Sequence, residues 1–214
     1  MALWIPAETL ARRWGGQVRR NGWLNSPSIH FAIQGRNAIL EFANFHAEQA
    51  YPSRYQKTLL TELSVDLKSA VSGSFKIGQR GVAGFLSGIF GRPPFRVGDR
   101  FFDELYIVHS EPEELARSLF APGQRDRVIA SVRRLGTYVN PRIDLSFGRL
   151  NVQVSELLEH ERGVQNLLDT TTDFVGYLLE RRSPDPIVWG DAGEDLGGKC
   201  PVCGAPLESP VITC

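Results

Sequence analysis

Residues 143–154 read IDLSFGRLNVQV, which is the clearest strand pattern in the chain. Apolar residues occupy every second position on each side of a glycine, at Ile143, Leu145, Phe147, Leu150, Val152 and Val154. A period of two is typical of strands with one buried face. The two runs meet at Gly148-Arg149, where glycine can supply the positive φ of a type II′ turn. The stretch therefore predicts a tight antiparallel hairpin.

The same alternation upstream predicts further strands. Between residues 59 and 67, apolar side chains share one face and polar or acidic side chains share the other. Shorter runs of this kind lie at residues 29–33, 38–45 and 75–77. Residues 102–108 contain few polar positions and predict a central strand that is covered on both sides. These runs favour an antiparallel sheet with one solvent-facing side.

Four stretches with apolar residues at helical spacing predict helices that flank this sheet. They lie at about residues 7–18, 113–120, 124–135 and 161–181, and Ser110 with Glu113 resembles a capping box before the second. The sequence thus predicts an α+β domain over residues 1–181, with room for two subdomains at about 1–98 and 99–181. A linker at 182–198, rich in Pro, Gly and Asp, follows it.

The amino-acid composition of the chain disfavours some classes of binding partner. The 24 basic and 24 acidic residues cancel, so no global field draws the chain to nucleic acid or anionic lipid. No apolar run approaches the ~20 residues that span a bilayer, and the first residues do not form a signal peptide. All three cysteines lie in the last fifteen residues, unlike a disulfide framework. We expect a cytoplasmic protein with no membrane partner.

A glycine-rich segment at residues 78–98 has two interpretations. Its six glycines disfavour a regular element, yet its apolar content is too high for a solvated linker. It is either an irregular loop folded onto the core or an apolar surface that docks a partner through Phe85 and Phe90. Arginines near these rings would also suit the binding of single-stranded nucleic acid, but the zero net charge disfavours this alternative.

No common catalytic pattern is complete. His160-Glu161 begins the H-E-x-x-H motif of metalloproteases, but Val164 stands where the second histidine is required. The four histidines are scattered singly, and no phosphate-binding or dinucleotide-binding glycine motif is present. We therefore predict no catalytic residue. An enzyme with an unrecognised site within residues 1–181 is the third hypothesis for function.

The segment 199–214 carries the strongest chemical signal. Cys200 and Cys203 are three positions apart on a tight turn, with Gly204 directly after them, so both thiolates can bind one tetrahedral zinc ion. Cys214 follows after ten residues. Structural zinc takes four ligands, so we expect an incomplete zinc knuckle here, with zinc bound only where the module continues beyond Cys214. Incidental free thiols are the alternative.

This cysteine pattern resembles the opening of the prokaryotic RING finger family. The resemblance implies that Cys200 and Cys203 belong to a first zinc site, Cys214 to a second, and that Val202 contacts an E2 conjugating enzyme. It implies a RING-type E3 or E3-like adaptor in a bacterial ubiquitin-like conjugation pathway, with the E2 and a ubiquitin-like protein as partners. Such a ligase positions the E2 thioester and forms no covalent intermediate. Zinc ribbons also open C-P-x-C-G, so a non-enzymatic interaction protein with a structural zinc ribbon is the alternative.

A second resemblance concerns the domain itself. The segments 102–103, 116–119 and 143–147 are similar to a bacterial family of unknown function. That likeness implies a bacterial origin and a folded, non-catalytic domain, and it implies no activity. In the RING-type hypothesis, this front domain recognises a substrate, a ubiquitin-like protein or another pathway component.

Overall fold

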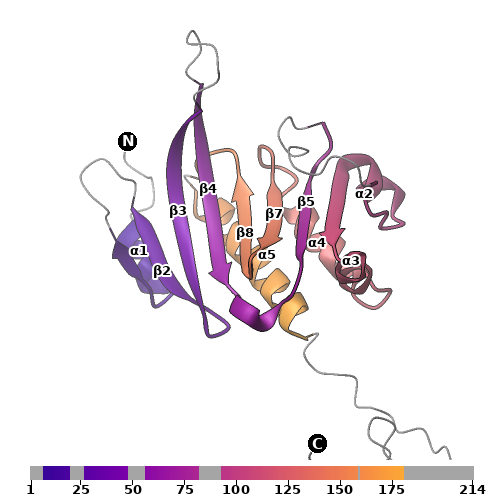
Figure 1. Ribbon diagram of the computed structural model, residues 1–214. Coiled ribbons are helices and arrows are strands. Elements are labelled where there is room, and N and C mark those ends of the chain that lie inside the picture. Colours follow the sequence, from indigo (N-terminus) through magenta and orange to yellow (C-terminus); the bar gives the residue numbers. More distant parts are fainter. Residues whose placement is uncertain (1–6, 20–26, 48–55, 82–92, 159, 181–214) are drawn as a thin grey trace, which may run out of the picture. The chain divides into compact units, whose positions relative to one another are not determined.

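Figure 1 shows the computed structural model of the chain. The structure describes residues 7–19, 27–47, 56–81, 93–158 and 160–180. The chain divides into two units, Met1–Glu180 and Arg181–Cys214, and every described residue belongs to the first. We call this first unit the sheet domain.

The described residues form one eight-stranded sheet in which all neighbouring strands are antiparallel. In chain order the strands are β1 (Gln17–Arg19), β2 (Ser28–Ile33), β3 (Arg36–Ala47), β4 (Gln56–Asp66), β5 (Ser74–Gln79), β6 (Tyr106–Glu111), β7 (Arg142–Ser146) and β8 (Arg149–Val154). Across the sheet their order is β1-β2-β3-β4-β8-β7-β5-β6. Because β8 pairs with β4 and β5 lies between β6 and β7, strands from before and after residue 98 share one sheet.

Helices flank the sheet, so the predicted α+β class is confirmed for this domain. They are α1 (Ala7–Arg13), the 3₁₀ helix η1 (Lys68–Ala70), α2 (Arg100–Leu105), α3 (Glu113–Leu119), α4 (Arg125–Arg134) and α5 (Glu161–Leu179). In Figure 1, α4 and α5 lie behind the sheet. Helix α5 contacts β4, β8 and α4. The predicted long helix at 161–181 and the helix through 128–135 are confirmed.

One hydrophobic core fills the space between the helices and one face of the sheet. The strands contribute alternate residues to it, which include Ile29, Leu40, Leu63, Val65, Ile77, Ile143, Leu145, Leu150 and Val152. Helix α5 contributes Phe174, whose ring stacks on Phe75 at 6.0 Å between centroids. Each fully buried side chain of this size stabilises the fold by about 1.5–3 kcal/mol. The alternation in the sequence therefore predicted the core face correctly.

The hairpin β7–β8 forms as predicted, but its turn differs. Ser146 pairs with Arg149, so the loop residues are Phe147 and Gly148. Their φ angles are 50° and 71°, and positive φ at both positions is the mark of a type I′ turn. The predicted type II′ turn at Gly148-Arg149 is wrong. Because the turn removes Phe147 from the alternation, its side chain is fully exposed instead of lying in the core.

The predicted strand at residues 102–108 is wrong in its first half. Arg100–Leu105 forms α2, because the carboxylate of Asp99 accepts a hydrogen bond of 2.8 Å from the backbone N–H of Phe102 and caps the helix. Helical spacing buries Phe102 completely and leaves Phe101 70% exposed. In the sequence, the adjacent apolar residues Phe101 and Phe102 are typical of a strand that is covered on both sides. Only the capping residue Asp99 indicates a helix at this position.

The second half of that segment is strand β6, which lies at the end of the sheet and is not central. Among the strands that the structure describes, its only neighbour is β5, and on its other side Phe95 forms an isolated bridge with Val108. The backbone N–H of Phe95 donates to the Val108 carbonyl oxygen at 2.8 Å. This bridge satisfies one of the backbone groups that an edge strand leaves unpaired.

Two predicted helix boundaries also differ. The capping box does not form: α3 begins after Pro112, and the Ser110 hydroxyl donates to the Pro112 carbonyl oxygen at 2.7 Å. The first helix ends at Arg13 and does not continue to residue 18. Gly16 lies so close to strand β2 that an added Cβ would be 2.6 Å from the His30 carbonyl oxygen. The chain there joins the sheet as β1.

Candidate interaction surface

The site residues predicted from the sequence lie outside the described residues. They are Phe85, Phe90, Cys200, Val202, Cys203 and Cys214. Within the part of the chain that the structure describes, no group of three or more His, Cys, Asp and Glu side chains is placed to hold a metal ion. The described residues instead present one extended polar surface on the sheet.

This surface is the face of the sheet that points away from the hydrophobic core, and we call it the open face. Strand pairing aligns its side chains in rows across the sheet. The first row runs Arg19, Ser28, Glu41, Glu62, Gln153, Arg142, Gly78 and Ile107. The second runs Gln17, His30, Ile39, Ser64, Asn151, Asp144, Lys76 and His109. A shorter third row contains Asp66, Arg149 and Ser146.

The acidic residue Asp144 lies among the basic side chains of the open face. The side chain is 12% exposed, and its carboxylate accepts hydrogen bonds from Ser146 at 2.8 Å and from Arg142 at 3.3 Å. The ammonium group of Lys76, on the neighbouring strand, lies 3.6 Å away. A carboxylate this buried needs such partners, because an unpaired buried charge is costly. Asp144 thereby holds two cations in place and leaves a net positive patch.

The acidic part of the open face lies on β3 and β4. Glu41 is exposed and stands directly across from the partly buried Glu62. Burial, and then the neighbouring carboxylate of Glu41, raise the pKa of Glu62, while Arg149 and Arg142 act in the opposite direction. Like charges opposite each other on a sheet are destabilising. Arg149 and Arg142 of the same chain offset part of this repulsion.

Asn151 lies between the two parts of the open face. Its side-chain carbonyl oxygen is buried and has no hydrogen-bond partner among the side chains that the structure describes. Asn151 pairs across the strands with Ser64 on one side and Asp144 on the other. The open face is therefore polar along its whole centre.

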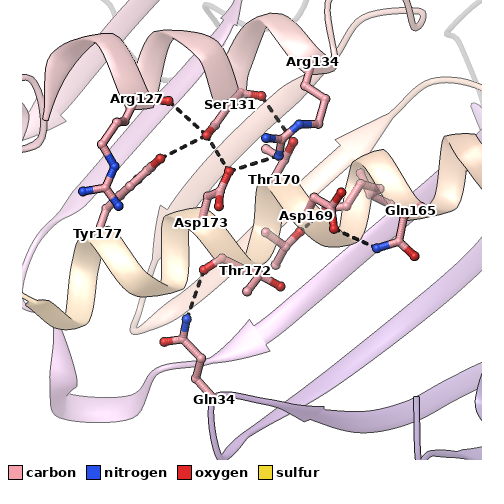
Figure 2. A network of polar contacts seen from close by, with 12 residues as sticks. Gln34, Arg127, Ser131, Arg134, Gln165, Asp169, Thr170, Thr172, Asp173 and Tyr177 are labelled. Carbon is pink, nitrogen blue, oxygen red and sulfur yellow. Dashed lines mark hydrogen bonds and ion pairs between the residues drawn. The ribbon is translucent and has the colours of Figure 1, made fainter. Parts of the chain in front are cut away.

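A separate polar network joins helices α4 and α5 (Figure 2). The Ser131 hydroxyl is 2.7 Å from Oδ2 of Asp173 and 3.2 Å from the Tyr177 hydroxyl, and Arg134 donates to the same carboxylate oxygen at 3.0 Å. Ser131 is 1% exposed. A buried serine beside a carboxylate would need a histidine base to act as a nucleophile, and the residues of this network include none. The network fixes the packing of the two helices.

The histidines of the described residues are far apart in the sheet. His30 lies on β2, His46 on β3 and His109 on β6. Burial lowers the pKa of His30 and of His109, with Arg19 as the next cause for His30 and Lys76 for His109. His160 precedes α5, so the incomplete metalloprotease motif begins at a helix boundary. This arrangement brings no two histidines together.

Exposed apolar side chains are few on the described surface. Phe101 and Leu105 occupy adjacent turns of α2, and Val139 and Phe147 lie in loops. The pair on α2 was not predicted, because a helix at this position was not expected from the sequence. Among the described helices, none combines the length and the apolar content needed to cross a membrane.

The open face was also missed from the sequence, although its signal was present. The polar positions of each alternating run, such as Glu62, Ser64 and Asp66, are the residues that form it. Which strands lie side by side decides which charges meet, and alternation carries no information on that.

Comparison with known proteins finds no match for this chain among family models, curated proteins or solved structures.

Proposed function

We propose that this chain is a RING-type E3 or E3-like adaptor of a bacterial ubiquitin-like conjugation pathway. The observation that carries the proposal is the segment Cys200-Pro201-Val202-Cys203-Gly204, with Cys214 ten residues later. Two thiolates three residues apart bind one zinc ion, and a glycine directly after them permits the tight turn. By resemblance, the third cysteine belongs to the second zinc site of a RING.

In this proposal the zinc module recruits the E2 enzyme and the sheet domain recognises a substrate or the ubiquitin-like protein. Val202 lies between two metal ligands, so its side chain points away from the zinc ion and is held rigidly. A small, rigid apolar residue of this kind suits a protein contact. The ligase acts by positioning the E2 thioester, which requires no nucleophile of its own.

The test compares E2-dependent transfer and zinc content between the wild-type protein and its variants at Val202 and Cys200. Val202→Arg is expected to abolish E2-dependent transfer of the ubiquitin-like protein while zinc content stays unchanged, because the new charge is desolvated against the E2 without a counter-ion. Val202→Ile, the matched control, retains the apolar contact and should keep transfer. Cys200→Ser should lose zinc and transfer together. Normal transfer by Val202→Arg would overturn the ligase proposal.

The second candidate is an interaction protein whose cysteines form a structural zinc ribbon. It is favoured by Gly204, because C-P-x-C-G also opens zinc ribbons. The same variants separate the two candidates. A native protein that binds zinc, loses it in Cys200→Ser and binds no E2 fits the ribbon and excludes the ligase.

Partner recognition by the sheet domain involves the glycine-rich segment in this proposal. Phe85 and Phe90 supply the apolar contacts, and replacing both by serine should weaken binding of the ubiquitin-like protein. The melting temperature should stay nearly unchanged. A large fall in melting temperature would instead assign these rings to the core, where a buried aromatic contributes about 3 kcal/mol or more.

A further inference from the structure

The open face divides by charge along a line between β4 and β8. On one side, Glu41, Glu62 and Asp66 project from β3 and β4, and Arg19 on β1 is the basic residue in the same row as Glu41. On the other side, Arg149, Arg142 and Lys76 project from β8, β7 and β5, together with the acidic residues Asp144 on β7 and Glu111 on β6. The electrostatic influence of Arg149 and Arg142 on Glu62 shows that the two sides are close neighbours. We propose that this face binds the open face of a second copy of the chain and forms a two-fold symmetric dimer.

The symmetry follows from the strand order. A two-fold axis parallel to the strands, between β4 and β8, places β4 of one copy opposite β8 of the other and β3 opposite β7. Glu41 and Arg142 stand in the same row, so Glu41 of each copy faces Arg142 of its partner. In the third row Asp66 faces Arg149 in the same way. Each contact occurs twice, which gives an isologous interface with four ion pairs.

The centre of this interface is polar but compatible with close packing. Glu62 of each copy faces Gln153 of its partner, whose amide can donate to the carboxylate. Ser64 of each copy faces Asn151 of its partner. Two sheets pack face to face at about 10 Å, a gap that glutamate and arginine side chains span together. The same rotation sets His30 against Lys76, and burial and Arg19 favour the neutral form of His30 by lowering its pKa.

The size of the face fits a weak dimer. Seven strand spacings of ~4.8 Å and about five residues of ~3.3 Å along the strands give roughly 34 Å by 17 Å, or about 600 Å² per copy. A standard interface buries about 800 Å² per partner. With a smaller area and mostly polar contacts, association should occur at micromolar concentrations and should weaken as salt screens the four ion pairs.

A second copy fits better than a polyanion or a membrane surface. Half of the open face is acidic and would repel phosphate groups, and the net charge of the chain is zero. A different protein would need the mirrored charge pattern, whereas a second copy carries it by symmetry. The inference is independent of the proposed ligase function, because it uses only residues of the sheet domain.

Sedimentation velocity of the full chain tests the dimer. At about 50 μM and low salt we expect a dimer that dissociates between about 50 and 500 mM NaCl. Glu41→Arg and Arg149→Glu should each shift the chain to monomer. Glu114→Arg on α3, an exposed position away from this face, makes the same change in net charge as Glu41→Arg and should leave the dimer intact.

The combination Asp66→Arg with Arg149→Glu restores opposite charges across the proposed axis and should recover the dimer. Circular dichroism and thermal melting of each variant show whether it is folded, and a variant that unfolds is replaced by the charge-neutral Glu41→Gln or Arg149→Gln. A chain that is monomeric at every concentration and salt overturns the proposal. So does a dimer that survives both Glu41→Arg and Arg149→Glu, or a folded charge-swapped variant that stays monomeric.

Discussion

The hydroxyl group of Ser131 on α4 lies 2.7 Å from Oδ2 of Asp173 on α5. The carboxylate oxygen also accepts a hydrogen bond from Arg134, and the Thr170 hydroxyl donates to the Ser131 carbonyl oxygen at 3.2 Å. Figure 2 shows that these side chains bridge the two helices. Since α5 packs on β4 and β8, the network sets the position of α4 over the sheet.

A double-mutant cycle on Ser131→Ala and Asp173→Ala should show coupling of about 1–3 kcal/mol, because the hydrogen bond is charge-assisted and one partner is buried. Urea unfolding of the two single variants and the double variant measures it. The exposed pair Glu113–Arg117 on α3 is the control and should couple by only about 0.3–0.5 kcal/mol. Additive effects at Ser131 and Asp173 would contradict this role.

Phe101 and Phe102 provide a test of helix α2. The two rings are adjacent in the sequence, yet Phe102 is completely buried against Tyr106 and Phe120 while Phe101 is 70% exposed. Phe102→Ala should therefore reduce the free energy of unfolding by about 3–5 kcal/mol, and Phe101→Ala should change it by less than about 0.5 kcal/mol. Chemical denaturation measures both. Equal losses would indicate that both rings are buried, as in a covered strand.

Gly148 is required by both its conformation and its surroundings. Its φ is +71°, and an added Cβ would collide with the Lys68 carbonyl oxygen, while the Leu67 N–H donates to the Gly148 carbonyl oxygen at 2.8 Å. Gly35 has a φ of +73° and open space around it, so Gly35→Ala carries only the conformational cost of about 1–2 kcal/mol. Gly148→Ala should cost clearly more in thermal or urea unfolding. Equal losses for the two variants would mean that the chain moves away from Gly148 freely.

Glu62 should make stability depend on pH. Its pKa is raised in the folded protein, so its contribution to stability is present below the ordinary glutamate value and is lost as pH rises through the folded pKa. Glu62→Gln removes the ionised form and should be more stable than the wild type at neutral pH. The difference should shrink as pH falls below the ordinary value.

Urea unfolding of Glu62→Gln and wild type at several pH values, in high salt to keep both monomeric, checks this expectation. Glu114→Gln is the control, because this glutamate is exposed on α3. A difference between Glu62→Gln and wild type that is constant across the pH range would show that ionisation of Glu62 is not its cause.

Within the regular strands, the sequence by itself determined which residues line the core and which face away from it. A period of two assigns Leu63, Val65, Leu150 and Val152 to one side of the sheet, because successive strand side chains point to opposite faces. It also predicted the hairpin at 143–154, apart from its turn type, and a long helix at about 161–181, which in the structure is Glu161–Leu179. The cysteine spacing of the last fifteen residues is likewise a property of the sequence alone.

The tertiary structure decided what alternation cannot encode, namely which strands are neighbours. Pairing of β4 with β8 depends on how distant segments pack over one core, and that pairing sets Glu62 across from Gln153 and creates the charge division of the open face. The helix at Arg100–Leu105 depends on a cap at Asp99 and on the space beneath Phe102, since six residues are too few to form a stable helix without tertiary packing. Local patterns fix which way a side chain points, and only long-range packing fixes what it meets.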